Sequence, residues 1–317
     1  MKIFAIVLAS IGLVLMLVFA LFPAFNDWSF LVNPERASQY GSLMSGIAGP
    51  LLTLATFLIL YSTLTAQHKS IEDQRRVNAD TEKASLKDRF ESRFFQLLSF
   101  HRDNVRQMRL KIPNSLSVVE GRQVFVEMRR ELREIIETVQ KVNEQNAKLL
   151  AKDQIAEIAY LIFFFGLQPQ DKETLILNLK HYEDDIKFSP VVSSILHSVS
   201  ISRTSQKYRN NYGHQSELGH YYRHLYQLVN FVHNCTFLTE NEKYDFVKTV
   251  RAQLSTYELV IFYFNTFTRF ANPWIENNLV MTYKLIKNIP PGFCLGYDPR
   301  VQFPMVYEWQ EAANTSA

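Results

Sequence analysis

Two long stretches without charged side chains near the N-terminus constrain the fold of this chain more than any other feature. They cover residues 3–22 and 43–65, and neither contains Asp, Glu, Lys or Arg. A helix of about 20 residues is about 30 Å long, which matches the hydrocarbon thickness of a bilayer. A cleaved signal peptide is the alternative for the first stretch, but no clear small-x-small cleavage site follows it. The sequence therefore predicts two transmembrane helices within residues 1–65.

The charges around these stretches predict their orientation. The connecting residues 23–42 contain one cation, Arg36, whereas Lys69, Arg75 and Arg76 follow soon after the second stretch. Lysine and arginine are favoured on the cytoplasmic side of a membrane. We therefore expect both termini in the cytoplasm and a short loop outside.

One face of the second stretch is rich in small and hydroxylated side chains. At helical spacing it presents Ser42, Gly46, Gly49, Thr53, Thr56 and Thr63. Small residues allow helices to approach closely, and hydroxyl groups can form hydrogen bonds across the interface. This small-residue face predicts packing of the two spans against each other or against a neighbour. Alternatively, its threonines line a water-filled path in a homo-oligomer.

The remaining residues show the spacing of α-helices, with no comparable alternation of the kind that strands produce. Residues 66–111 predict a juxtamembrane helix that ends near Pro113. Residues 112–288 are expected to form an α-helical cytoplasmic domain, and residues 289–317 an irregular C-terminal tail. The predicted fold class is therefore all-α, with two N-terminal transmembrane helices before a helical domain.

Several segments of this domain carry more specific predictions. Residues 125–142 place apolar side chains three and four apart, and the run YLIFFF at 160–165 predicts a buried helix. Residues 239–264 predict a single helix that begins with a capping box of Thr239 and Glu242. His101 lies alone on an apolar stripe, which predicts a hydrogen-bonded histidine in the core.

Composition and motifs exclude several functional classes. The chain contains only 2 Cys, which rules out a disulfide framework and a cysteine-rich zinc site. It has no glycine-rich phosphate loop, no His-Glu-x-x-His motif and no nucleophile elbow, so an ordinary NTPase or metalloprotease is disfavoured. We expect no cofactor and no metal. The net charge of +3 is too small to imply nucleic-acid binding without a local patch.

The basic and histidine-rich residues 203–234 are the strongest candidate for such a patch. The cations that could contact nucleic acid or a partner are Arg203, Lys207, Arg209 and Arg223. The spacing of Arg209 and His214 also resembles the Arg-x-x-x-x-His motif of HEPN ribonucleases, in which the histidine acts as acid or base and the arginine holds a phosphate. A membrane-tethered ribonuclease and a nucleic-acid-binding or partner-binding module are therefore alternatives. The remaining interpretation is a solvated helix surface without a ligand.

Three stretches resemble a known family. They are RFFQLLSFHRDNV (93–105) with GRQVF (121–125) after it, LGHYYRHLYQLVNFV (218–232) and RAQLSTYELVIFYFN (251–265). Together with the predicted spans, they resemble the AbiC-like family of phage abortive-infection membrane proteins. The motif residues are site candidates without assigned chemistry: Arg122, His220, Arg223, Arg251, Gln253, Glu258 and Asn265. Glu258 and Asn265 fall beside the apolar stripe of their helix, and a buried ion pair with Arg223 or Arg251 would be a structural explanation for them.

The resemblance implies a toxic effector of anti-phage abortive infection in the bacterial inner membrane, where it contacts lipid. The small-residue face, the short external loop and the absence of ordinary catalytic motifs predict that this effector disrupts the integrity of that membrane on activation. Some relatives lie beside retron reverse transcriptases, so the resemblance also implies a reverse transcriptase with its RNA–DNA hybrid as an inhibitory partner. The resemblance assigns no catalytic residue.

Overall fold

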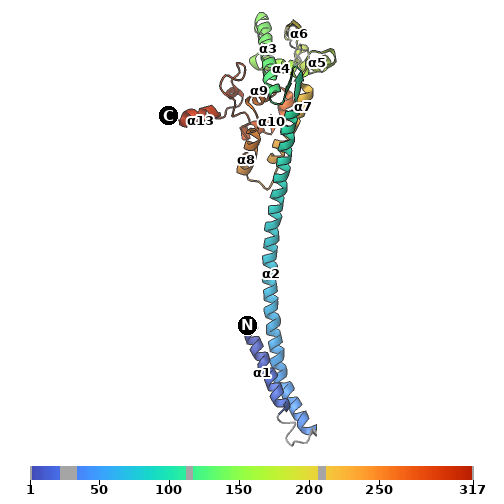
Figure 1. Cartoon of the computed structure of the whole chain (residues 1–317), viewed down its shortest axis with the longest axis vertical. Helices are drawn as coiled ribbons and strands as arrows, with labels where there is room; N and C mark the ends of the chain where they lie inside the picture. The colour runs from blue at the N-terminus through green and yellow to red at the C-terminus, as the bar shows by residue number, and fades with distance from the viewer. Residues whose placement is uncertain (1, 22–33, 112–116, 206–211, 316–317) are drawn as a thin grey trace. The chain divides into compact units, whose positions relative to one another are not determined.

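The computed structural model describes residues 2–21, 34–111, 117–205 and 212–315, and these residues are mostly helical (Figure 1). The chain divides into two compact units, Met1–Arg89 and Phe90–Ala317. Helix α2 (Pro34–Gln107) contributes residues to both units. The boundary that the sequence predicted between residues 65 and 66 therefore falls inside a continuous helix.

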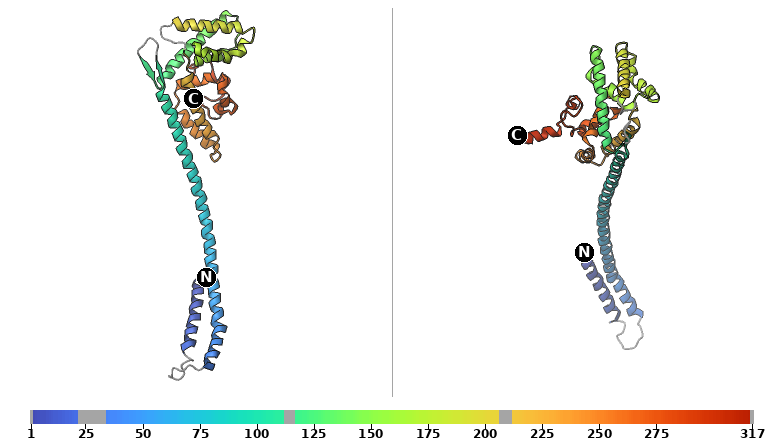
Figure 2. Two further views of the ribbon diagram at one scale, coloured as in Figure 1. Left: turned by 90° about the vertical axis from the view of Figure 1, so that its right-hand side faces the viewer. Right: turned by 45° about the horizontal axis from the view of Figure 1, so that its top comes forward.

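The first unit contains helix α1 (Lys2–Leu21) and the first part of α2. The two helices lie side by side within this unit (Figure 2). At their contact, a Cβ atom built on Gly12 would lie 3.5 Å from the side chain of Leu52, which is an ordinary van der Waals distance. One helix among the described residues, Ser45–Gln107 of α2, is long and apolar enough to cross a membrane by length and composition.

The small-residue face lies outside the contact between α1 and α2. All six of its residues are exposed, whereas Ala55 and Ser62 on another face of α2 are buried. The hydroxyl groups of Thr53 and Thr56 donate hydrogen bonds within their own helix, to the carbonyls of Gly49 and Leu52. Packing of α1 on this face is thus not seen in the structure, and packing against a neighbouring subunit stays a prediction.

The second unit opens with the last turns of α2, which are followed by strands β1 (Arg109–Lys111) and β2 (Val118–Glu120). The strands pair antiparallel, with Leu110 opposite Val119. The sequence predicted helix as far as residue 111. Each strand has three residues, which is too short to produce a recognisable alternation. Pro113, the expected helix end, lies outside the described residues.

The rest of the second unit is helical, which confirms the all-α prediction for most of the domain. Its elements are α3 (Gln123–Gln145), α4 (Lys152–Phe165), α5 (Pro169–Glu183), α6 (Ser189–Ser205), α7 (Gln215–His233), α8 (Glu240–Arg251), α9 (Thr256–Asn265), the 3-10 helix η1 (Arg269–Ala271), α10 (Asn272–Glu276), α11 (Leu279–Thr282), α12 (Pro299–Gln302) and α13 (Glu308–Thr315).

Helix α4 forms the centre of the core. Its residues 160–165 are buried on every side, as predicted, and the helix contacts α3, α5, α7 and α9. The apolar stripe of α3 is buried as predicted, with Phe125, Met128 and Leu132 fully enclosed. The tail also joins the core through Tyr297, Phe303 and Tyr307, and it contains two helices where the sequence predicted an irregular segment.

The predicted single helix over 239–264 is two helices, α8 and α9, separated at residues 252–255. The capping box of Thr239 and Glu242 is present at the start of α8. A second capping box begins α9, where the backbone N–H of Ser255 donates to Oε2 of Glu258 at 2.7 Å. The Ser-x-x-Glu pattern was a visible signal for this start. The apolar stripe runs across the break, so periodicity alone predicted one helix.

Candidate functional site

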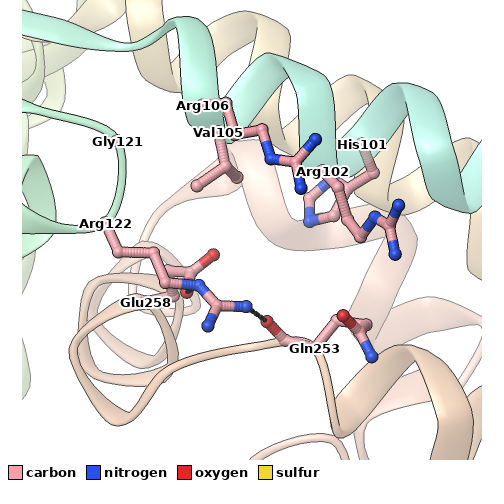
Figure 3. Close-up of a pocket in the computed structure, with 8 residues that line it drawn as sticks. All are labelled: His101, Arg102, Val105, Arg106, Gly121, Arg122, Gln253 and Glu258. Atoms are coloured by element: carbon pink, nitrogen blue, oxygen red, sulfur yellow. Dashed lines mark hydrogen bonds and ion pairs between the residues drawn. The ribbon is translucent and has the colours of Figure 1, made fainter.

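A pocket of about 330 Å³ lies where the end of α2, the turn before α3 and the connection between α8 and α9 meet (Figure 3). Three of the seven family-motif candidates, Arg122, Gln253 and Glu258, come together in its wall. The full lining is His101, Arg102, Val105, Arg106, Gly121, Arg122, Gln253 and Glu258. The break between α8 and α9 matters here because it places Gln253 and Glu258 at the pocket.

Arg122 links the two other motif residues. Its Nη2 donates a hydrogen bond to the backbone carbonyl of Gln253 at 2.7 Å, and its Nε lies 4.0 Å from Oε2 of Glu258. The side chain of Arg122 is 59% exposed and that of Glu258 is 1% exposed, so the arginine covers a buried carboxylate. The cation beside Glu258 is therefore Arg122, and not Arg223 or Arg251 as the sequence suggested.

The turn before α3 positions Arg122. Gly121 has φ of +61°, a backbone conformation that glycine adopts at little cost. Its N–H donates to the carbonyl of Met108 at 2.9 Å, which ties the turn to the residue after α2. Arg122 follows directly and is thereby held over the pocket.

Glu258 is a buried acid. Burial raises its pKa, and the hydrogen bonds from Ser255 and the charge of Arg122 oppose this shift. The hydroxyl of Tyr221 approaches its Oε1 at 3.4 Å, which is a long hydrogen bond. Glu258 thus keeps acceptor capacity toward the pocket.

His101 is the most unusual lining residue. It is 1% exposed, and neither ring nitrogen has a hydrogen-bond partner within the described residues. Burial, with a smaller effect from the charge of His224, lowers its pKa to about 4, so the ring is neutral at pH 7. The predicted core position is confirmed, but the predicted hydrogen bond is wrong. Figure 3 shows the ring directed toward the pocket.

The pocket carries an excess of positive charge. Arg102 and Arg106 lie on the exposed side of α2, so that three arginines face one acid, Glu258, in the lining. Nη1 of Arg106 lies 3.3 Å from Oδ1 of Asp103, an ion pair one turn earlier on the same helix. Such a lining attracts anions.

The other four motif candidates lie outside the pocket lining. Arg251 is buried, and its Nη1 donates to the carbonyls of Tyr283 and Lys284 at 3.1 Å each, which fixes the end of α8. Asn265 is buried at the end of α9. His220 and Arg223 are exposed one turn apart on α7, with Nη2 of Arg223 at 3.5 Å from Nδ1 of His220.

The basic segment contains a buried ion cluster. Nη2 of Arg203 donates to Oε1 of Glu131 and, at 3.1 Å, to the carbonyl of Tyr212. Nε2 of His214 lies 3.0 Å from Oε2 of Glu131. Arg203 is only 4% exposed, so it is not the surface cation that the sequence predicted. The cluster joins α3, α6 and the start of α7.

The alternative catalytic pair can be placed only in part. Arg209 and Lys207 lie outside the described residues. His214 is 4% exposed and is held by Glu131, so it is not open to an RNA substrate in this structure. Gly213 beside it is sterically required, because a Cβ atom there would lie 2.2 Å from the carbonyl carbon of Phe165.

Comparison with known proteins gives one match. Residues 213–294 match the model of a family described as "putative phage abortive infection protein". No curated protein and no solved structure matches the chain. The matched residues run from the start of α7 to beyond α11 and include Gln253 and Glu258 of the pocket. The family resemblance is therefore confirmed over residues 213–294, and this match supports a role in defence against phage.

Proposed function

We propose that this chain is a toxic effector of abortive infection that is anchored in the bacterial inner membrane and disrupts that membrane when activated. The observation that carries the proposal is the match of residues 213–294 to an abortive-infection family in a chain whose helix α2 contains a segment long enough to cross a bilayer. In this proposal, α1 also spans the membrane and both termini are cytoplasmic. The Phe90–Ala317 unit is the regulatory domain.

The small-residue face supports an assembly of several copies. Its six residues are exposed and lie apart from the contact with α1. In lipid, such a face packs against another helix, because small side chains allow close approach and its hydroxyls gain partners. The proposed lesion is a rearrangement of these helices in a homo-oligomer that lets ions cross. A retron reverse transcriptase with its RNA–DNA hybrid is the proposed inhibitory partner, and the family resemblance is its support.

A single time course after induced expression tests the proposal. Membrane potential, dye entry and RNA integrity are measured together in cells, along with phage restriction. We expect depolarisation before any loss of RNA. RNA decay that precedes depolarisation would contradict membrane disruption and support the ribonuclease alternative.

Substitutions on the small-residue face test the role of the spans. Gly49→Leu and Thr53→Leu place bulk on this face and should abolish both depolarisation and toxicity. Leu54→Phe is the matched control, because it adds bulk at an exposed position of the same helix about 100° away from Thr53. If both leucine variants depolarise cells as the wild type does, the spans serve only as an anchor.

A further inference from the structure

The geometry points to the pocket beneath Arg122 as a binding site for a small phosphorylated molecule, of the nucleotide or sugar-phosphate kind, that contributes its phosphate to the arginines and a hydroxyl group to Glu258. The site would regulate the proposed effector, so its biological meaning rests on the proposed function. The binding itself rests only on the pocket.

The arginines supply the charge and the geometry for a phosphate. A guanidinium group has five N–H donors in a planar fork, and phosphate oxygens are favoured acceptors for it. Arg122 uses one donor on the carbonyl of Gln253, which orients the group while other N–H bonds stay available. Arg106 lies on the opposite side of the pocket from Arg122 (Figure 3), and its ion pair with Asp103 restricts its side chain. Arg102 lies on the same side as Arg106, on α2 (Figure 3). A phosphate between α2 and Arg122 would meet cations from two elements.

His101 is the second, independent indication of a ligand. Buried polar atoms in native proteins nearly always have a hydrogen-bond partner, so an exception needs an explanation. Both ring nitrogens of His101 lack one in the described part of the chain, although the residue is only 1% exposed. A neutral imidazole offers one donor and one acceptor. A ligand in the pocket would satisfy the ring where the protein itself does not.

Glu258 restricts the class of ligand to molecules that carry hydrogen-bond donors next to their phosphate group. An inorganic anion alone would be repelled by this carboxylate, which Arg122 approaches only to 4.0 Å. A hydroxyl group on the ligand would instead donate to Glu258. The volume of about 330 Å³ lies at the lower end of the range of about 300–1,000 Å³ for small-molecule sites. These features together favour a ribose phosphate unit.

Calorimetric titration of the full-length protein in detergent micelles tests the site. The probes are AMP, ribose 5-phosphate, adenosine and inorganic phosphate. We expect AMP and ribose 5-phosphate to bind, adenosine not to bind, and inorganic phosphate to bind at least about tenfold more weakly than AMP, because it has no hydroxyl donor for Glu258. Affinity for AMP should also fall as salt rises.

Two pocket variants and one control make the test specific. Arg102→Gln with Arg106→Gln should weaken AMP binding by about tenfold or more. His101→Phe, which keeps a ring against Tyr221, should also weaken it. Arg130→Gln is the matched control, because Arg130 is an exposed arginine in an (i, i+3) ion pair with Glu127, as Arg106 is with Asp103.

The outcomes separate this site from the proposed function. Absence of AMP binding, equal binding of adenosine and AMP, or an unchanged AMP affinity in either pocket variant overturns the site. Because binding is measured on purified protein, these results leave the membrane proposal standing. A protein that binds AMP as expected but neither depolarises cells nor restricts phage retains the site and refutes the proposed function.

Discussion

Acidification should destabilise the folded protein through His101, and the size of the effect follows from its burial. The imidazole has a pKa of about 4 in the folded chain against 6.5 in a solvated one. Below pH 6.5 the unfolded chain therefore binds a proton that the folded chain does not, so folding stability is present above this pH and is lost as pH falls toward 4. Between pH 7 and pH 5, the loss from this one group is about 2 kcal/mol.

Other titratable groups lie near His101, so the measurement must isolate its contribution. His224 on α7 opposes protonation of His101 by its charge. Glu258 on α9 acts in the opposite sense, because burial raises its pKa and its protonation at low pH then favours the folded state. A comparison of the wild type with His101→Phe removes these shared contributions.

The assay is urea unfolding of the full-length protein in detergent micelles at pH 7 and pH 5, followed by fluorescence of the buried Trp274. The free energy of unfolding should fall between the two pH values by about 2 kcal/mol more in the wild type than in His101→Phe. The variant removes polar atoms that have no partner, so its stability at pH 7 should equal or exceed that of the wild type. Equal losses in the two proteins would refute the reasoning.

Three further substitutions and one control have defined outcomes. Gly213→Ala should destabilise the fold by about 1–3 kcal/mol, because its Cβ atom would meet the backbone of α4; thermal unfolding tests this, and an unchanged midpoint would contradict the close approach. Glu131→Gln should cost about 3–5 kcal/mol, since it removes the carboxylate beside buried Arg203, and urea unfolding measures it. Ser255→Ala and the control Thr239→Ala should each cost about 1 kcal/mol in the same assay, but only Ser255→Ala should also weaken AMP binding.

The sequence predicted the helices that bury one apolar face in the core. It did not predict the break between α8 and α9, which a local capping pattern marks. The stripe at 125–142 was predictable because a helix that buries one face must repeat its apolar residues with the helical period. The same criterion joined α8 and α9, because Leu254 and Tyr257 continue the apolar pattern across the break. The capping pair of Ser255 and Glu258 marked the break and outweighs the stripe.

The site was predictable as a set of residues and not as a geometry. Arg122, Gln253 and Glu258 were identified as candidates, but Arg122 lies 131 positions before the carbonyl that it binds. Only the packing of α3 against α9 brings them together. The same limit explains why the burial of Arg203 was not predicted. Its position in a basic segment suggests an exposed side chain. Glu131 lies three positions after Met128, on the buried face of α3, and a buried acid requires a cation.

Two groups of buried ionisable residues in the described part of the domain differ in what they imply. Around Glu131, the cation Arg203 and the ring of His214 supply partners, so burial of that carboxylate is explained by structure alone. His101 has no such partner in the described chain, and a buried polar group left unsatisfied costs about 1–3 kcal/mol. A ligand that supplies the missing hydrogen bonds recovers this free energy on binding. Pocket occupancy should therefore stabilise the folded domain, by about 2.7 kcal/mol at a concentration of 100 times Kd, and this stabilisation is the route by which the proposed ligand would act on the proposed effector.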